Sequence, residues 1–142
     1  MSLNPCPTRP TVLCIDDSLL VRKTIAMILG KHVELWSAAT AEEGLALARA
    51  RHPNLVVTDI HMPGMDGYAM LQALKADPAT RHLPVVALTS ACSAAERERG
   101  MAAGFMDYVS KSADLSALMR LVAELTRHQD LPAAAAVTGA TA

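Results

Sequence analysis

Residues 55–67 read Leu-Val-Val-Thr-Asp-Ile-His-Met-Pro-Gly-Met-Asp-Gly, and they carry the clearest indication of the fold class. It begins with a short apolar run, which is typical of a parallel strand covered on both faces. A carboxylate, Asp59, closes the run, and a turn containing Pro63 and Gly64 follows it. The pattern predicts a strand over 55–58 that delivers Asp59 to one edge of a sheet.

Further short apolar runs predict the rest of that sheet. They occur at Thr11–Ile15, at Val85–Leu88 and around Tyr108–Val109. The run Val33–Ala38 differs because Glu34 interrupts it, which favours a strand at the edge of the sheet.

The segments between these runs carry helix signals. Thr40 with Glu43, and Ser93 with Glu96, have the spacing of capping boxes, and Gly30 stands where a helix would end. Leu115, Leu118, Met119, Val122 and Leu125 form an apolar stripe on a last helix. Strand and helix thus alternate five times, which predicts an α/β fold: a flavodoxin-like, doubly wound, five-stranded parallel sheet of order 2-1-3-4-5 with helices on both faces.

Length and composition fit one domain and exclude several function classes. The 142 residues carry 13 Lys plus Arg against 14 Asp plus Glu, a net charge of −1, which argues against direct nucleic-acid binding or a polybasic membrane contact. No apolar run approaches the ~20 residues of a membrane span, and no secretory signal is recognisable. Cys6, Cys14 and Cys92 are widely spaced and indicate neither a disulfide framework nor a zinc site, so a reducing, cytoplasmic location is expected.

Composition also indicates where the structured domain begins and ends. Pro5, Pro7 and Pro10 predict a disordered lead-in over 1–10, and the Ala-rich segment 129–142 predicts a flexible tail or linker. One structured domain is therefore expected over 11–128.

Reactive side chains follow four of the five predicted strands. Asp16 and Asp17 follow the first strand, Asp59 the third, Thr89 the fourth and Lys111 the fifth. Each residue alone is weak evidence, because turns and helix caps often use Asp and Thr. Since parallel strands end at the same edge, however, these side chains are expected to converge on one site.

The residue types at that edge suit one reaction. Three clustered carboxylates repel one another and need a cation, and an oxygen-only site favours Mg²⁺. A carboxylate is also a competent nucleophile that can form an aspartyl phosphate. Phosphoryl transfer then needs mainly positioning and charge neutralisation, to which Mg²⁺, Lys111 and the Thr89 hydroxyl can all contribute.

Together Asp16-Asp17, Asp59 with the loop 62–67, Thr89, Tyr108 and Lys111 resemble the receiver domain of two-component response regulators. The resemblance covers about Thr11 to Arg127. It implies that Asp59 is the phosphoacceptor, and that Asp16, Asp17, Asp59 and the backbone of His61 hold Mg²⁺. It also implies that Thr89 and Tyr108 form a switch, in which Thr89 moves towards the phosphoryl group while Tyr108 turns inward.

The resemblance further implies a regulatory phosphoacceptor, not an enzyme, although one that assists its own phosphorylation and dephosphorylation. The phosphoryl donor would be a phosphohistidine on a sensor histidine kinase or a histidine phosphotransfer protein. The switch would alter the face formed by the helix 94–103, the strand at 108–109 and the last helix. The recipient would be a downstream protein target or a fused output domain.

Some features depart from the family pattern, and one rival reading stays open. Ser112 follows Lys111 where the family usually has a proline after a cis bond, so the isomer of this bond is undetermined. Phe105 is expected in the core and the His61 side chain at the surface.

Three rival functions are disfavoured by the sequence. A phosphatase of the haloacid dehalogenase type would need an Asp at the position of His61, and in a flavodoxin the Asp16-Asp17 pair would repel the phosphate of the flavin cofactor. The nucleotide-binding G-x-x-x-x-G-K loop is absent from the sequence. The remaining alternative is a receiver-like binding module that does not depend on phosphorylation.

Overall fold

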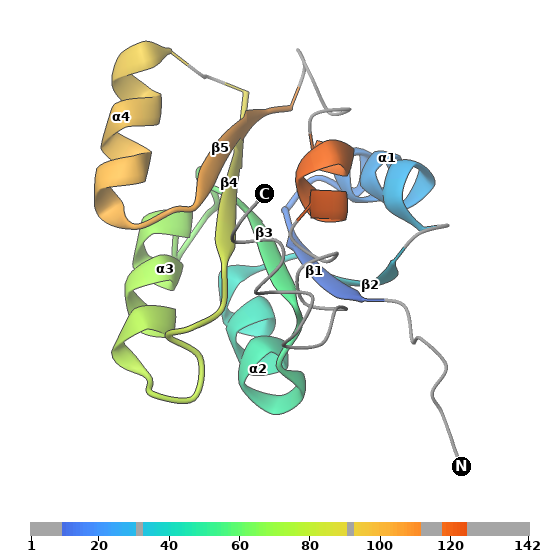
Figure 1. Cartoon of the computed structure of the whole chain (residues 1–142), viewed down its shortest axis with the longest axis horizontal. Helices are drawn as coiled ribbons and strands as arrows, with labels where there is room; N and C mark the ends of the chain where they lie inside the picture. Colours follow the sequence, from blue (N-terminus) through green and yellow to red (C-terminus); the bar gives the residue numbers. More distant parts are fainter. Residues whose placement is uncertain (1–9, 31–32, 91–92, 112–117, 125–142) are drawn as a thin grey trace, which may run out of the picture.

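The computed structural model describes residues 10–30, 33–90, 93–111 and 118–124, and a single parallel sheet organises them (Figure 1). Its strand order is β2-β1-β3-β4-β5, as predicted. The strands are β1 (Thr11–Ile15), β2 (Glu34–Ala38), β3 (Leu55–Asp59), β4 (Val85–Thr89) and β5 (Asp107–Ser110). Every neighbouring pair is parallel, so the carboxyl ends of all five strands lie along one edge.

Helices connect successive strands and cover both faces of the sheet. They are α1 (Leu19–Leu29), α2 (Ala41–Arg51), α3 (Gly67–Ala76) and α4 (Ala94–Ala103), and residues 118–124 are also helical. Figure 1 places α1 beside the helix of 118–124 on one side, and α2 and α3 on the other. Among the described residues, no helix has the length and apolar character needed to cross a membrane.

The predicted strand pattern corresponds to the observed burial. All residues of β3 and β4 are buried, as expected for central strands with helices on both faces. The edge strand β2 buries only Ala38 fully and exposes Glu34. One core cluster, which includes Leu13, lies against α2 and α3, and the other, which includes Val12, lies against α1 and the helix of 118–124.

The capping residues start the helices where the sequence indicates. The Thr40 hydroxyl accepts a hydrogen bond from the Glu43 N–H at 3.1 Å, and the Glu43 carboxylate accepts one from the Ala39 N–H at 3.0 Å. The Ser93 hydroxyl accepts from the Glu96 N–H at 3.1 Å and starts α4. These bonds satisfy N–H groups of the first turn, which have no partner within the helix.

Other predictions lie partly outside the described residues. Phe105 is buried in the core, as expected, and Leu118 and Val122 are the buried residues within the described helical segment 118–124. The predicted tail and nearly all of the predicted lead-in lie outside the described ranges, as do Leu115 and Leu125. The Lys111–Ser112 peptide bond also falls outside them.

Candidate functional site

The acidic pair Asp16-Asp17 follows β1 in a tightly bonded turn. The Asp16 N–H donates to the Ala38 carbonyl at 3.1 Å, which holds the turn to β2. The Asp16 Oδ1 accepts from the Ser18 N–H at 2.8 Å, and the Ser18 hydroxyl in turn caps α1. Asp16 is fully buried whereas Asp17 is exposed, so the pair has one fixed carboxylate and one that faces solvent.

Asp59 ends β3 and is only 3 % exposed. Its Oδ1 accepts a long hydrogen bond of 3.4 Å from the His61 N–H, so the backbone of His61 lies beside the carboxylate. The His61 side chain is exposed, as expected. Burial and then the charge of Asp16 raise the pKa of Asp59, while Lys111 and the His61 N–H act in the opposite direction.

The loop after Asp59 requires its glycines. Gly64 has a φ of 78°, a conformation that glycine adopts without steric cost. At Gly67 an added Cβ would lie 2.6 Å from the Asp59 carbonyl oxygen, so only glycine lets α3 begin this close to the strand. Asp66 caps α3 by accepting from the Ala69 N–H at 2.8 Å. The loop therefore folds back tightly over the end of β3.

Three carboxylates converge on this edge, as the sequence predicted. One oxygen each from Asp16, Asp17 and Asp59 lies within 4.8 Å of the others. Such oxygen-only ligands, one of them solvent-facing, match the preference of Mg²⁺ for a few carboxylates together with water and phosphate oxygens. The cluster could therefore hold a divalent cation of this kind.

Lys111 is the cation already present at the cluster. Its Nζ lies 2.9 Å from Asp16 Oδ2 and 3.2 Å from Asp59 Oδ1. Burial by itself lowers the pKa of Lys111, but the contacts with Asp16 and Asp59 outweigh it, so the net shift is upward. The Lys111 N–H donates to the Thr89 carbonyl at 2.8 Å, which fixes the backbone that carries the side chain.

Thr89 and Tyr108 lie on the adjacent strands. Thr89 ends β4, is fully buried and pairs in register with Ser110 of β5. Tyr108 is 2 % exposed, and its ring packs against α4 at Gly100. The structure thus brings Asp16, Asp17 and Asp59 together and places the Lys111 ammonium beside Asp16 and Asp59. Thr89 is connected to this cluster through the Lys111 backbone, and Tyr108 packs against α4.

Two supporting residues were not predicted from the sequence. The Arg22 Nη1 donates to the Asp16 carbonyl at 2.6 Å, and the Ser18 N–H orients the Asp16 carboxylate. Ser18 had a readable signal, since a serine directly before an apolar helix is a common cap. Arg22 had none, because a cation one turn into α1 fits a solvent-facing position equally well.

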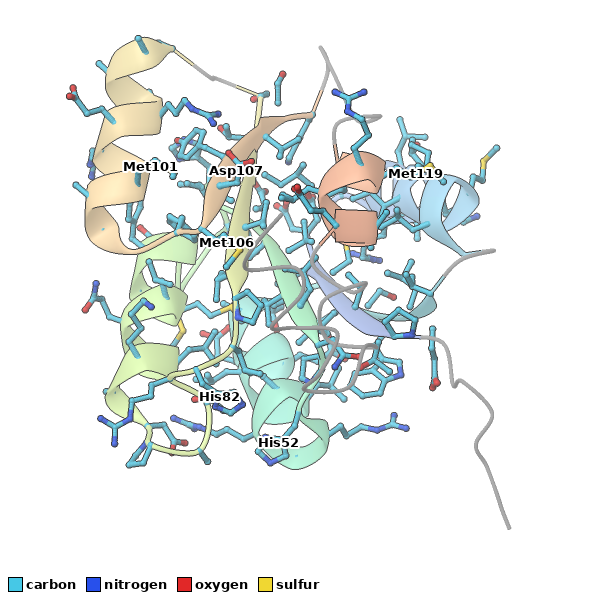
Figure 2. The ribbon with its side chains drawn as sticks, in the orientation of Figure 1. His52, His82, Met101, Met106, Asp107 and Met119 are labelled. Atoms are coloured by element: carbon cyan, nitrogen blue, oxygen red, sulfur yellow. The ribbon has the colours of Figure 1, made fainter. Side chains whose placement is uncertain are left out.

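A hollow of about 340 Å³ lies elsewhere, on the loops that enter β3 and β4. His52, Pro53, Asn54, His82, Leu83 and Pro84 line it. Figure 2 shows His52 and His82 near the end of α2. Because these histidines precede β3 and β4, they lie at the opposite end of the strands from Asp59, which ends β3. None of the predicted site residues lines this hollow.

A flavodoxin-like parallel sheet with an acidic pair, a third aspartate and a lysine at its carboxyl edge defines a class of signalling domains. Residues 12–123 match the family described as the response regulator receiver domain. The chain belongs to this receiver family of two-component response regulators.

Individual relatives agree with this assignment. Response regulator PleD of Caulobacter vibrioides is 35% identical over 82% of this chain, which covers 26% of that protein. Protein PilH of Pseudomonas aeruginosa is 30% identical over 78% of this chain and 93% of its own length. The N-terminal domain of a response regulator receiver protein from Methanoculleus marisnigri superposes with a TM-score of 0.68 at 31% identity, covering 81% of this chain and 94% of the other. The chain thus spans about a quarter of PleD and nearly all of PilH.

Proposed function

We propose that this receiver domain is a phosphoacceptor switch whose acceptor is Asp59. The observation that carries the proposal is the convergence of three carboxylate oxygens within 4.8 Å with the Lys111 ammonium beside two of them. Asp59 is the candidate nucleophile because it ends the central strand and lies beside both the lysine and a backbone N–H. Thr89 and Lys111 are proposed to assist the transfer.

The proposed phosphoryl transfer needs no reactant besides Asp59 and the phosphohistidine donor. An Asp59 carboxylate oxygen attacks the phosphorus of a phosphohistidine, an O–P bond forms and the P–N bond breaks. The electron pair of the broken bond stays on the imidazole nitrogen of the donor. Lys111 offsets negative charge on the transferred group, and the Thr89 hydroxyl is proposed to donate a hydrogen bond to it.

Asp16, Asp17, Asp59 and the His61 carbonyl are the proposed ligands of Mg²⁺. When bound, this ion would neutralise charge on the phosphoryl oxygens and reduce the repulsion among the carboxylates. Asp16 suits this role because Ser18 and Arg22 fix its turn, and Asp17 because it faces solvent.

The proposed partners follow from the same chemistry. The donor is a phosphohistidine of a sensor kinase or a phosphotransfer protein in the cytoplasm. The response passes through Thr89 and Tyr108 to the face formed by α4, β5 and the helix of 118–124. A downstream protein or a fused output domain would read that face.

The test is incubation with Mg²⁺ and a small phosphodonor such as acetyl phosphate, followed by intact mass measurement. One phosphoryl group should be added, and EDTA or Asp59→Asn should prevent it. Asp66→Asn is the matched control, because Asp66 lies on the same loop and Asn also caps helices well. An unchanged mass under strong donor conditions would instead favour a binding module that works without phosphorylation.

A further inference from the structure

The hollow on the loops that enter β3 and β4 has a lining unlike that of the carboxylate cluster. Two of the described residues that line it are histidines, His52 and His82, and both are exposed. Pro53 and Leu83, which follow them, are buried, and no acidic side chain is among the described lining residues. The hollow therefore offers imidazole nitrogens beside apolar side chains.

The two histidines hold equivalent positions on neighbouring segments. Each stands three residues before its strand, since β3 begins at Leu55 and β4 at Val85. The two strands are paired, and the Val56 N–H donates to the Pro84 carbonyl at 3.0 Å where they begin. Paired strands lie about 4.8 Å apart. The pairing thus brings both imidazoles to the same hollow, near the end of α2 (Figure 2).

The backbone of His52 has a conformation that its residue type does not favour. It ends α2 with φ 49° and ψ 73°, the left-handed region that helix ends usually give to glycine. Among the described residues, His52 is the one non-glycine residue with a positive φ. Its N–H donates to the Ala48 carbonyl at 3.0 Å, a bond that a glycine would make equally well. A use for the imidazole itself would explain why a histidine stands there.

Neither imidazole is engaged elsewhere in the part of the chain that the structure describes. No hydrogen bond or ion pair joins either side chain to another described residue. The arginine beside His52 has another partner, because Arg51 stacks on Trp36 with its Cζ 4.4 Å from the ring centroid. Arg81, beside His82, is exposed and is not among the residues that line the hollow. The nitrogens of both histidines are therefore available to a ligand.

We propose that His52 and His82 together bind a divalent transition-metal ion of the Zn²⁺, Ni²⁺ or Cu²⁺ class. Imidazole nitrogen is a ligand that these ions favour, whereas Mg²⁺ prefers oxygen. Water would complete the coordination, because both side chains are exposed. The bound ion would join the end of α2 to the segment before β4. This site is separate from the carboxylate cluster, and the inference does not rest on the proposed function.

The first experiment is a titration with Cu²⁺, followed by the fluorescence of Trp36, which is the single tryptophan of the chain. Trp36 contacts Arg51, the residue before His52, so Cu²⁺ bound in the hollow should quench it. Excess Mg²⁺ is present to occupy the carboxylates. His52→Gly and His82→Ala should each weaken Cu²⁺ binding about 100-fold, the lower end of the gain from joining two ligands. His61→Ala is the matched control and should titrate like the wild type, because His61 lies beyond the other end of β3.

Two measurements separate a metal site from a change at the helix end. Electron paramagnetic resonance of the copper-loaded wild type should show coupling to two nitrogen ligands, and that of either variant to one. His52→Gly gives the end of α2 its usual residue, so the metal-free thermal midpoint should be no lower than that of the wild type. A lowered midpoint with unchanged Cu²⁺ affinity would assign His52 to the helix end and overturn the proposal.

The second experiment uses Zn²⁺ and thermal unfolding, again with excess Mg²⁺. Zn²⁺ should raise the midpoint of the wild type, because an ion that binds only the folded state stabilises it, and should not raise that of either histidine variant. Asp59→Asn should respond to Zn²⁺ as the wild type does. The proposal is overturned if the wild type binds no Cu²⁺, if Cu²⁺ binding survives both histidine substitutions, or if Asp59→Asn abolishes it.

Discussion

Replacing Lys111 by Met should destabilise the metal-free protein, because it leaves two buried carboxylates without their cation. The Lys111 Nζ lies 2.9 Å from Asp16 and 3.2 Å from Asp59. At an effective dielectric constant of about 20, each contact corresponds to about 5 kcal/mol of attraction. Much of this attraction offsets the cost of burying the ammonium group. Removing one charged partner from a buried ion pair typically lowers the unfolding free energy by about 3–5 kcal/mol.

We therefore expect Lys111→Met to lower the metal-free unfolding free energy by about 3 kcal/mol. Urea unfolding measures this, and the midpoint should fall by about 1–2 M for a domain of this size. Lys75→Met is the matched control, since Lys75 is exposed on α3 and should change stability by less than about 0.5 kcal/mol.

Magnesium should then restore much of the loss. An ion that binds only the folded state at about 100 times its dissociation constant adds about 2.7 kcal/mol. The gain should be larger in Lys111→Met than in the wild type, because Lys111 and Mg²⁺ neutralise the same oxygens. If the variant is as stable as the wild type without metal, or gains less from Mg²⁺, the electrostatic account of this site is wrong.

Three other predictions concern residues in and around the carboxylate cluster. The folded state binds a proton at Asp59 more tightly than the unfolded chain does, so ionisation of Asp59 costs stability above the ordinary carboxyl pKa. Metal-free Asp59→Asn should therefore be more stable than the wild type at pH 7, and a thermal-unfolding series should show this advantage disappearing as the pH is lowered to about 4. Gly67→Ala should lower the unfolding free energy by about 1–3 kcal/mol in urea, because its methyl would lie 2.6 Å from the Asp59 carbonyl oxygen; a neutral result would contradict the tight turn. Burial, and next the charge of Asp16, raise the pKa of Cys14 to about 12, so peptide mapping should find this thiol unmodified by alkylating reagents until urea unfolds the chain.

The sequence predicted the sheet well because each strand carries a local signal. The all-buried strands β3 and β4 appear as unbroken apolar runs, and the edge strand β2 is marked by Glu34. The helix starts at Thr40 and Ser93 were equally readable, because a capping hydroxyl acts on N–H groups only a few residues away. Parallel strand direction then sufficed to predict that Asp16, Asp59 and Lys111 meet.

The remaining features depend on contacts between distant elements, which carry no local signal. The sequence did not predict that Arg22 would bind the Asp16 carbonyl or that Arg97 would bind β5. In the sequence, Arg97 belongs to a run of alternating charges that indicates a solvated helix. Its neighbour Glu96 looks like half of a capping box, yet its carboxylate accepts a hydrogen bond from Tyr108. Only the packing of α4 on β5 distinguishes these side chains from ordinary surface charges.

The sparse burial of α4 has an evolutionary consequence. Since Gly100 is its only buried residue, most positions of the helix can change without opening a cavity in the core. Duplicated copies of such a chain could therefore diverge along α4 while the core and the carboxylate cluster stayed the same. Gly100 is the position where that divergence should be slowest, because the ring of Tyr108 leaves no room for a side chain there.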